Sequence, residues 1–291
     1  MIRRLRARDR VRLAVLTLPL LAVATSSTLA APPPAVQEGA TLRLVVAGVV
    51  DGRPEVGLEI ALEPGWKTYW RSPGDAGIPP TVDWSKSSGI KGVDLLFPAP
   101  VRFGDEEVRS IGYTAPVLMP IDVTLADPES PARLELDVQV GLCHDICVPV
   151  SAHLAATLAP QAPIDDGARV RLAEARRALP VPAVKGVAPW VVRIERDDEQ
   201  AAGALLVEVK MPADETDDDR CDVLVEGPND AWALPLPEKV AESGGRETWR
   251  FDLDGVPRGA DLAGAELRFT MRARDRVVEQ RVVLDAAIGR P

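Results

Sequence analysis

Cys143 and Cys147 are two of the three cysteines in the chain, and they lie four residues apart in the segment GLCHDICVPV. Two thiols at this spacing can form a structural disulfide, open and close as a redox pair, or bind a soft metal ion. His144 lies between them and His153 follows Cys147 by six residues. The residue types alone leave all three interpretations open.

The spacing of the two cysteines constrains the backbone between them. Five residues of straight strand span about 13 Å from first to last Cα, whereas the Cα atoms of a disulfide lie within about 7 Å of each other. The chain must therefore turn between Gly141 and Cys147 if the bond forms. A helix is disfavoured there because Pro149 follows at once and both flanks alternate with period two.

A disulfide across so short a loop stabilises a fold poorly, since in the chain-entropy model even a 15-residue loop yields only about 3 kcal/mol. A domain of this size buries a sufficient hydrophobic core without such a bond. The pair therefore suits reversible redox chemistry better than a purely structural disulfide. A closed zinc site would need four ligands, and the sequence has no second close pair of cysteines. The metal alternative is a soft Cu(I) site from Cys143 and Cys147 with His153.

Two strands are expected to position the cysteines. Residues 133–142 alternate between apolar and polar side chains, and the alternation resumes over residues 147–157. Earlier in the chain, residues 41–50 and 54–64 also alternate around the turn sequence DGRP, which predicts a hairpin. Between these pairs, residues 65–85 are dense in Trp, Pro and Gly, which excludes a regular helix and predicts a long, irregular functional segment.

The fold class expected is all-β, with two immunoglobulin-like sandwich domains joined by a short, partly helical linker. The first domain covers residues 40–157 and the second residues 189–288. The linker, residues 158–188, holds helix formers between an acidic flank and Pro180. Strands are expected in the second domain at residues 190–197, 204–211, 221–227, 248–254, 265–274 and 276–285. Cys221 opens one of them and is interpreted as a small buried residue.

Residues 1–30 combine a basic start, a short apolar run and small residues before a cleavage point, which is typical of a secretory signal peptide. We therefore expect export to the periplasm of a Gram-negative bacterium, where disulfides persist, with no membrane span after cleavage. The formal net charge of −10 argues against a nucleic-acid partner.

Four segments then resemble the N-terminal periplasmic domain of the DsbD family of thiol–disulfide interchange proteins, in its ScsB-like branch. In chain order they read GWKTYWRSPGDAGIPPTVDWS, FPAPVRF, IGYTAPVLMPIDV and GLCHDICVPVSAHL. The resemblance covers about residues 40–157. It implies an immunoglobulin-like sandwich with a redox-active pair that takes electrons from a membrane-embedded domain and passes them to periplasmic thioredoxin-fold proteins.

The resemblance also implies residue roles. Cys147 forms the mixed disulfides and Cys143 resolves them. Phe103 occupies the place of an aromatic cap residue that covers the pair, and Tyr69 matches a tyrosine near the cysteines. Two features depart from the family: three residues separate the cysteines where many members have five, and the membrane-embedded and thioredoxin-like domains are missing from this sequence.

The function expected is thus that of a stand-alone periplasmic electron carrier of the protein-disulfide reductase type, without a cofactor. Its partners would be a separate polytopic membrane thiol reductase and thioredoxin-fold clients, serving cytochrome c maturation, disulfide isomerisation or copper tolerance. The alternative is a non-enzymatic periplasmic binding or copper-tolerance protein, in which Cys143 and Cys147 stay a structural disulfide or bind Cu(I).

Overall fold

The computed structural model describes residues 32–74, 77–104, 109–197, 203–212 and 221–286. The expected signal peptide, residues 1–30, lies outside this part of the chain. Nearly all regular structure in the described residues is β, with one helix, so the all-β prediction is confirmed. No helix among them is long and apolar enough to cross a membrane.

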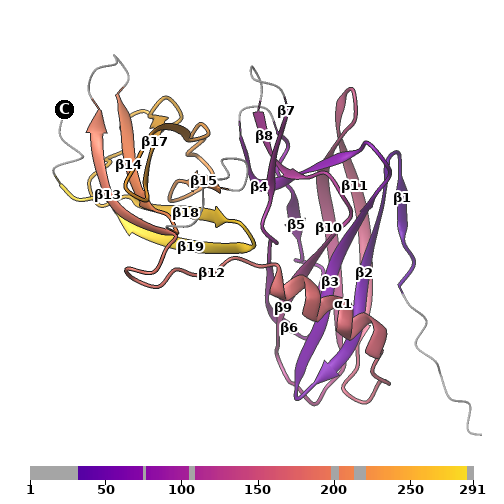
Figure 1. Ribbon diagram of the computed structural model, residues 1–291. Helices are drawn as coiled ribbons and strands as arrows, with labels where there is room; N and C mark the ends of the chain where they lie inside the picture. Colours follow the sequence, from indigo (N-terminus) through magenta and orange to yellow (C-terminus); the bar gives the residue numbers. More distant parts are fainter. Residues whose placement is uncertain (1–31, 75–76, 105–108, 198–202, 213–220, 287–291) are drawn as a thin grey trace, which may run out of the picture. The chain divides into compact units, whose positions relative to one another are not determined.

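The first sandwich consists of two sheets built from β1 to β11 (Figure 1). One sheet has the order β1 (Ala35–Gln37), β2 (Ala40–Val50), β3 (Arg53–Leu62), β9 (Val117–Leu125) and β6 (Ile90–Leu95). The other has the order β11 (Cys147–Leu158), β10 (Ala132–Cys143), β4 (Lys67–Gly74), β8 (Arg109–Tyr113) and β7 (Val101–Gly104), with β5 (Thr81–Asp83) also paired to β10. Apolar side chains that alternate along β2, β3 and β10 fill the core between the sheets.

Both predicted hairpins of the first sandwich are present. β2 pairs with β3 across the turn at Asp51 and Gly52, which both have positive φ, as such a tight turn requires. β10 pairs with β11 without a register shift from Ala132 opposite Leu158 to Cys143 opposite Cys147. The period-two alternation in the sequence therefore identified the elements that carry the cysteines.

The expectation of an irregular segment at residues 65–85 was wrong in part, because this segment forms β4 and β5. Both strands pair with β10. Pro73 lies where the register of β4 against β8 shifts, and Pro79 and Pro80 precede β5, so these prolines interrupt no regular ladder. β4 and β5 thus extend the sheet that holds the cysteines.

Helix α1 (Asp166–Arg177) lies against the first sandwich (Figure 1). The side chain of Asp165 caps its first turn by accepting a 2.9 Å hydrogen bond from the backbone N–H of Ala168. Ala168 and Leu172 pack on Val45 of β2 in a small buried cluster of their own. The predicted acidic start and the helix itself are confirmed.

The second sandwich also has two sheets and a separate buried core, in which Phe251 and Phe269 meet edge to face. One sheet has the order β12 (Val181–Pro182), β19 (Arg276–Val283), β18 (Glu266–Ala273) and β15 (Cys221–Glu226). The other has the order β13 (Trp190–Asp197), β14 (Ala204–Lys210), β17 (Arg246–Asp252) and β16 (Glu238–Ser243). All six strands expected here are present; β12 and β16 were not foreseen.

Candidate functional site

The two cysteines form a disulfide at the end of the β10–β11 hairpin. Their Cα atoms lie 4.1 Å apart, and the three residues between them make the turn. The backbone N–H of His144 donates to the carbonyl oxygen of Ile146 across this turn, at 3.3 Å. The chain thus turns where the spacing required it to, if the bond was to form.

The two sulfur-bearing residues differ in their access to solvent. Cys147 is exposed, whereas Cys143 is half-buried between β11 and β4. Ile146, directly before Cys147, is 75% exposed at the tip of the turn. A partner protein can therefore approach Cys147 more readily than Cys143.

Tyr69 connects the buried interior to the exposed sulfur. Its ring is 1% exposed, yet its hydroxyl lies 2.8 Å from the Sγ of Cys147 and donates to it. The ring packs closely on β10 because Gly141 has no side chain: a Cβ there would lie 2.7 Å from the Tyr69 ring. Burial raises the pKa of the Tyr69 phenol, so it remains protonated and able to donate at neutral pH.

Phe103 covers Tyr69 from β7, the strand on the far side of β8, which we call the cap strand. The two ring centroids are 5.8 Å apart, with the planes tilted by 38°. β7 pairs with β8, placing Phe103 opposite Ser110. Residues 105–108, part of the stretch in which the cap was expected, lie outside the described residues. The structure therefore brings Cys143, Cys147, Tyr69 and Phe103 together.

Comparison with known families shows what the first sandwich is similar to. The profile of the family described as "Thiol:disulfide interchange protein DsbD, N-terminal" matches residues 36–159. Residues 36–159 form a DsbD-type N-terminal domain. The match spans both sheets of the first sandwich, including the whole β10–β11 hairpin.

The second sandwich has a counterpart among solved structures. The crystal structure of the N-terminal periplasmic domain of ScsB from Proteus mirabilis matches this chain with a TM-score of 0.67 and 20% sequence identity. The match covers 86% of this chain and 94% of the other, so the two share their fold over both sandwiches. The search of curated proteins found no match.

Lys67 is a residue of the DsbD-type domain that sequence reasoning missed. It begins β4 and is the register partner of Cys143 on β10. Directly opposed residues of antiparallel strands project to the same face with Cβ atoms about 5 Å apart, so the Lys67 ammonium group is within reach of the Cys143 sulfur. A cation at this place favours the thiolate form of a neighbouring cysteine.

The side chain of His144 contacts Trp66 and Asp145. Its ring packs on Trp66, with centroids 5.6 Å apart, and its Nδ1 lies 3.0 Å from a carboxylate oxygen of Asp145. Gly65 leaves room for this ring, because a Cβ there would lie 2.9 Å from its Nε2. His144 thus folds the turn back onto the domain and fixes its conformation.

His153 is not near the cysteines. Six residues of β11 separate it from Cys147, which is about 20 Å along an extended strand. Its Nδ1 lies 2.7 Å from Asp137, which also binds Lys86 at 2.6 Å. No group of three or more His, Cys, Asp or Glu side chains suited to a metal ion occurs among the described residues. The three residues of the Cu(I) alternative are therefore not brought together.

Cys221 lies in the second sandwich, at the start of β15, and is half-buried rather than fully buried. Its side chain packs against the core of that sandwich. It belongs to neither the hairpin nor the DsbD-type domain, so the candidate site contains two cysteines.

Proposed function

We propose that this protein is a thiol–disulfide exchange protein that relays electrons through Cys143 and Cys147. The observation that carries the proposal is the disulfide at an exposed hairpin tip, whose outer sulfur accepts a hydrogen bond from the buried Tyr69. A structural disulfide has no need of a polar donor aimed at one sulfur, whereas an exchange centre gains from it in the thiolate state.

In the loading step, a thiolate of the reduced donor attacks the Sγ of Cys147. The Cys143–Cys147 bond breaks, its electron pair leaves on the Cys143 sulfur, and a mixed disulfide joins Cys147 to the donor. The second thiolate of the donor then attacks the donor sulfur of this mixed disulfide and releases Cys147 as a thiolate. The donor is oxidised, and the pair has gained two electrons and takes up two protons.

In the unloading step, the Cys147 thiolate attacks the disulfide of an oxidised client and forms a second mixed disulfide. Cys143 then attacks the Cys147 sulfur, restores the intramolecular bond and releases the reduced client. The exposure of Cys147 and the half-buried position of Cys143 support this division of roles.

Three neighbouring side chains serve these steps. The hydroxyl of Tyr69 stabilises negative charge on Cys147 whenever that sulfur is the leaving or the attacking group. Lys67 does the same for Cys143 by its charge. Phe103 packs on Tyr69 and in this position limits exchange of the disulfide with stray thiols.

We place this exchange in the periplasm, with a membrane thiol reductase as electron donor and thioredoxin-fold proteins as clients. The secretory character of residues 1–30 and the DsbD-type domain support this placement. The ScsB domain of Proteus mirabilis, which has the same fold, is a periplasmic domain, and this agrees with the placement.

A trapping experiment tests the proposal. In a Cys221→Ser background, Cys143→Ser leaves Cys147 without its resolving partner, so a mixed disulfide with a purified oxidised thioredoxin should accumulate. The matched control, Cys147→Ser, should trap at least about tenfold less because Cys143 is less accessible. Products are counted on non-reducing gels and by intact mass spectrometry.

Equilibration of the unsubstituted pair in glutathione buffers provides the second measurement. Structural disulfides have potentials below about −300 mV, and we expect this pair to lie above that value. A potential well below it, together with no trapped thioredoxin, would contradict the exchange function. Stoichiometric, tight Cu(I) binding by the reduced protein would favour the binding alternative instead.

A further inference from the structure

The residue next to Phe103 on the cap strand contacts the second sandwich. Arg102 donates from Nε to a carboxylate oxygen of Asp222 and from its terminal nitrogen to the carbonyl oxygen of Val223, both at 2.7 Å. Successive residues of a strand project to opposite faces, so Phe103 faces Tyr69 while Arg102 faces β15. One short strand thus carries both the cap ring and an anchor.

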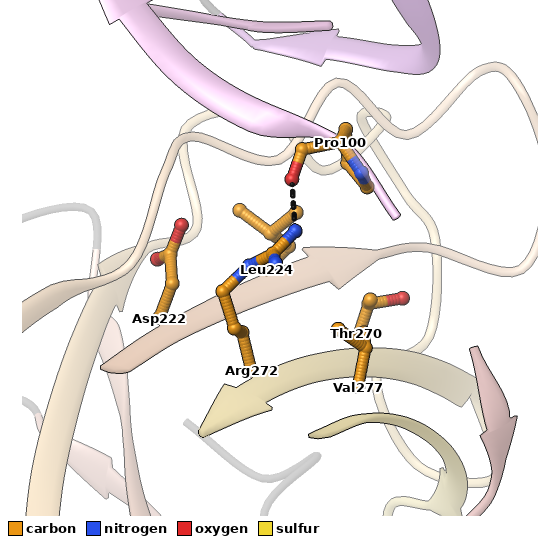
Figure 2. A pocket seen from close by; sticks show the side chains of 6 residues that line it. All are labelled: Pro100, Asp222, Leu224, Thr270, Arg272 and Val277. Atoms are coloured by element: carbon orange, nitrogen blue, oxygen red, sulfur yellow. Dashed lines mark hydrogen bonds between the residues drawn. The ribbon is translucent and has the colours of Figure 1, made fainter. Parts of the chain in front are cut away.

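A second contact holds the chain just before the cap strand. Figure 2 shows the guanidinium of Arg272, on β18, reaching the carbonyl oxygen of Pro100, and this hydrogen bond is 2.8 Å long. Leu224 of β15, seen beside it, is 3% exposed and belongs to the buried cluster of the first sandwich. The cap strand is therefore held by polar bonds around an apolar contact.

The strand that carries Tyr69 is anchored in the same way. Arg71, two residues after Tyr69 on β4, makes a two-pronged bond to Glu226 at 2.7 and 2.8 Å and a third to Glu279 at 3.0 Å. Such bidentate, charge-assisted bonds are among the strongest side-chain hydrogen bonds and fix orientation as well as distance. Both aromatic residues at the cysteine pair thus lie on strands fastened to the second sandwich.

The charges at the Arg102 contact are largely removed from water. The side chains of Arg102 and Asp222 are 19% and 20% exposed. Burial raises the pKa of the Asp222 carboxyl, and Arg102 and Arg272 counteract part of that rise. Removing one member of such a partly buried ion pair strongly destabilises the fold, because the other charge is left without compensation.

We propose that the second sandwich positions the cap: Arg102, bound to Asp222 and Val223, determines how often Phe103 leaves Tyr69 and thereby how readily a partner thiol reaches the disulfide. This inference rests on the proposed function, since it assigns a regulator to the same cysteine pair. Arg102 is a positioning residue that acts through Phe103 and forms no bond to sulfur. Loosening the anchor raises the rate of exchange in both directions equally and leaves the reduction potential unchanged.

The test measures the rate at which dithiothreitol reduces the disulfide in a Cys221→Ser background. Arg102→Gln should raise the second-order rate constant about tenfold, because losing the charge-assisted hydrogen bonds to Asp222 and Val223 shifts a local opening equilibrium. Arg102→Lys, which keeps the charge, should recover part of the protection. The matched control is Arg281→Gln, which removes an arginine–glutamate pair elsewhere in the second sandwich and should react at the parent rate.

Additional variants separate a positioning effect from general loosening. Phe103→Ala should raise the rate constant by itself, and Arg102→Gln should add nothing in that background, because both changes open the same cap. Asp222→Asn breaks the anchor from the other side and serves if Arg102→Gln does not fold, as judged by circular dichroism. Parent-level rates in both anchor variants, with a fast Phe103→Ala, would overturn the inference while leaving the exchange function intact.

A different result would contradict the proposed function. If Cys147 traps no thioredoxin in any variant, the electron relay is wrong, yet the dithiothreitol rates still report whether Arg102 governs access to the disulfide. Additive effects of Arg102→Gln and Phe103→Ala would show that the anchor acts elsewhere, and the inference would then be wrong.

Discussion

The hydroxyl of Tyr69 and the sulfur of Cys147 lie 2.8 Å apart, although the two residues are 78 positions apart in sequence. The bond joins a buried ring to an exposed redox-competent atom. It makes β4 as much a part of the site as the hairpin that carries the cysteines.

Tyr69→Phe tests this bond directly. The change keeps the ring and removes the donor, so the Cys147 thiolate loses its hydrogen bond. Alkylation of Cys147 by iodoacetamide at pH 7, in a Cys143→Ser, Cys221→Ser background, should slow by about three- to tenfold. Tyr113→Phe is the matched control, since that hydroxyl donates to the carbonyl oxygen of Pro98 instead of to a sulfur. Equal slowing of Cys147 alkylation in both variants would show that Tyr69 has no special role.

Gly141→Ala probes the space in which the Tyr69 ring lies. The new Cβ would meet the ring and Ile78, each at 2.7 Å. We expect a loss of about 1–3 kcal/mol in the free energy of unfolding by urea, the usual effect of overpacking, together with slower alkylation of Cys147. Gly92→Ala on β6 should be nearly neutral, because its nearest neighbour would lie at an ordinary 3.9 Å. An unaffected Gly141→Ala protein would mean that the ring is not confined there.

Lys67→Gln tests the charge opposite Cys143. In a Cys147→Ser, Cys221→Ser background, alkylation of Cys143 at pH 7 should slow by about threefold or more, as the thiolate loses a nearby cation. The difference should shrink at 1 M salt, where screening is strong. Lys91→Gln, on β6 in the other sheet, is the control of equal charge change. An alkylation rate that is unchanged in Lys67→Gln would show that Lys67 does not stabilise the Cys143 thiolate.

The two tyrosines, Tyr69 and Tyr113, predict how stability depends on alkaline pH. Burial raises the pKa of both phenols in the folded protein, and for Tyr113 the charge of Arg71 offsets only part of that rise. Their contribution to stability is therefore complete below pH 10, the ordinary value, and is lost as the pH rises above it. For Tyr113 the free energy of unfolding should fall by about 1.4 kcal/mol per pH unit.

Absorbance at 295 nm provides the readout, because these are the two tyrosines of the whole chain. Phenolate should appear only together with unfolding, and Tyr113→Phe should flatten the pH dependence of the urea midpoint. Ordinary titration of both rings near pH 10 in the folded protein would contradict the burial argument.

The sequence predicted the elements whose two faces differ. β10, β11 and the six foreseen strands of the second sandwich alternate between apolar and polar residues, and that signal is local. β16 escaped prediction because most of its residues are exposed, which leaves no alternation to detect. β4 was hidden by Pro73 and by Trp70, which is buried in the core, and by Trp66 just before the strand, which packs on the turn.

The site was predictable only as far as it is local or resembles a known family. The cysteines and the need for a turn followed from spacing, and Phe103 and Tyr69 followed from resemblance. Lys67 could not be found, because its place beside Cys143 depends on the register between β4 and β10. Arg102 could not be found either, since its partner lies 120 residues away and no local pattern encodes such pairings.

The position of the disulfide at the very end of its hairpin has a consequence for how this domain can vary. Only three residues are enclosed by the bond, while the twelve paired positions of β10 and β11 hold the strands together whether the sulfurs are joined or apart. Oxidation and reduction of the cysteine pair therefore change the pairing of β10 and β11 very little. Substitutions in His144–Ile146 can retune the potential over generations while the framework beneath them stays the same.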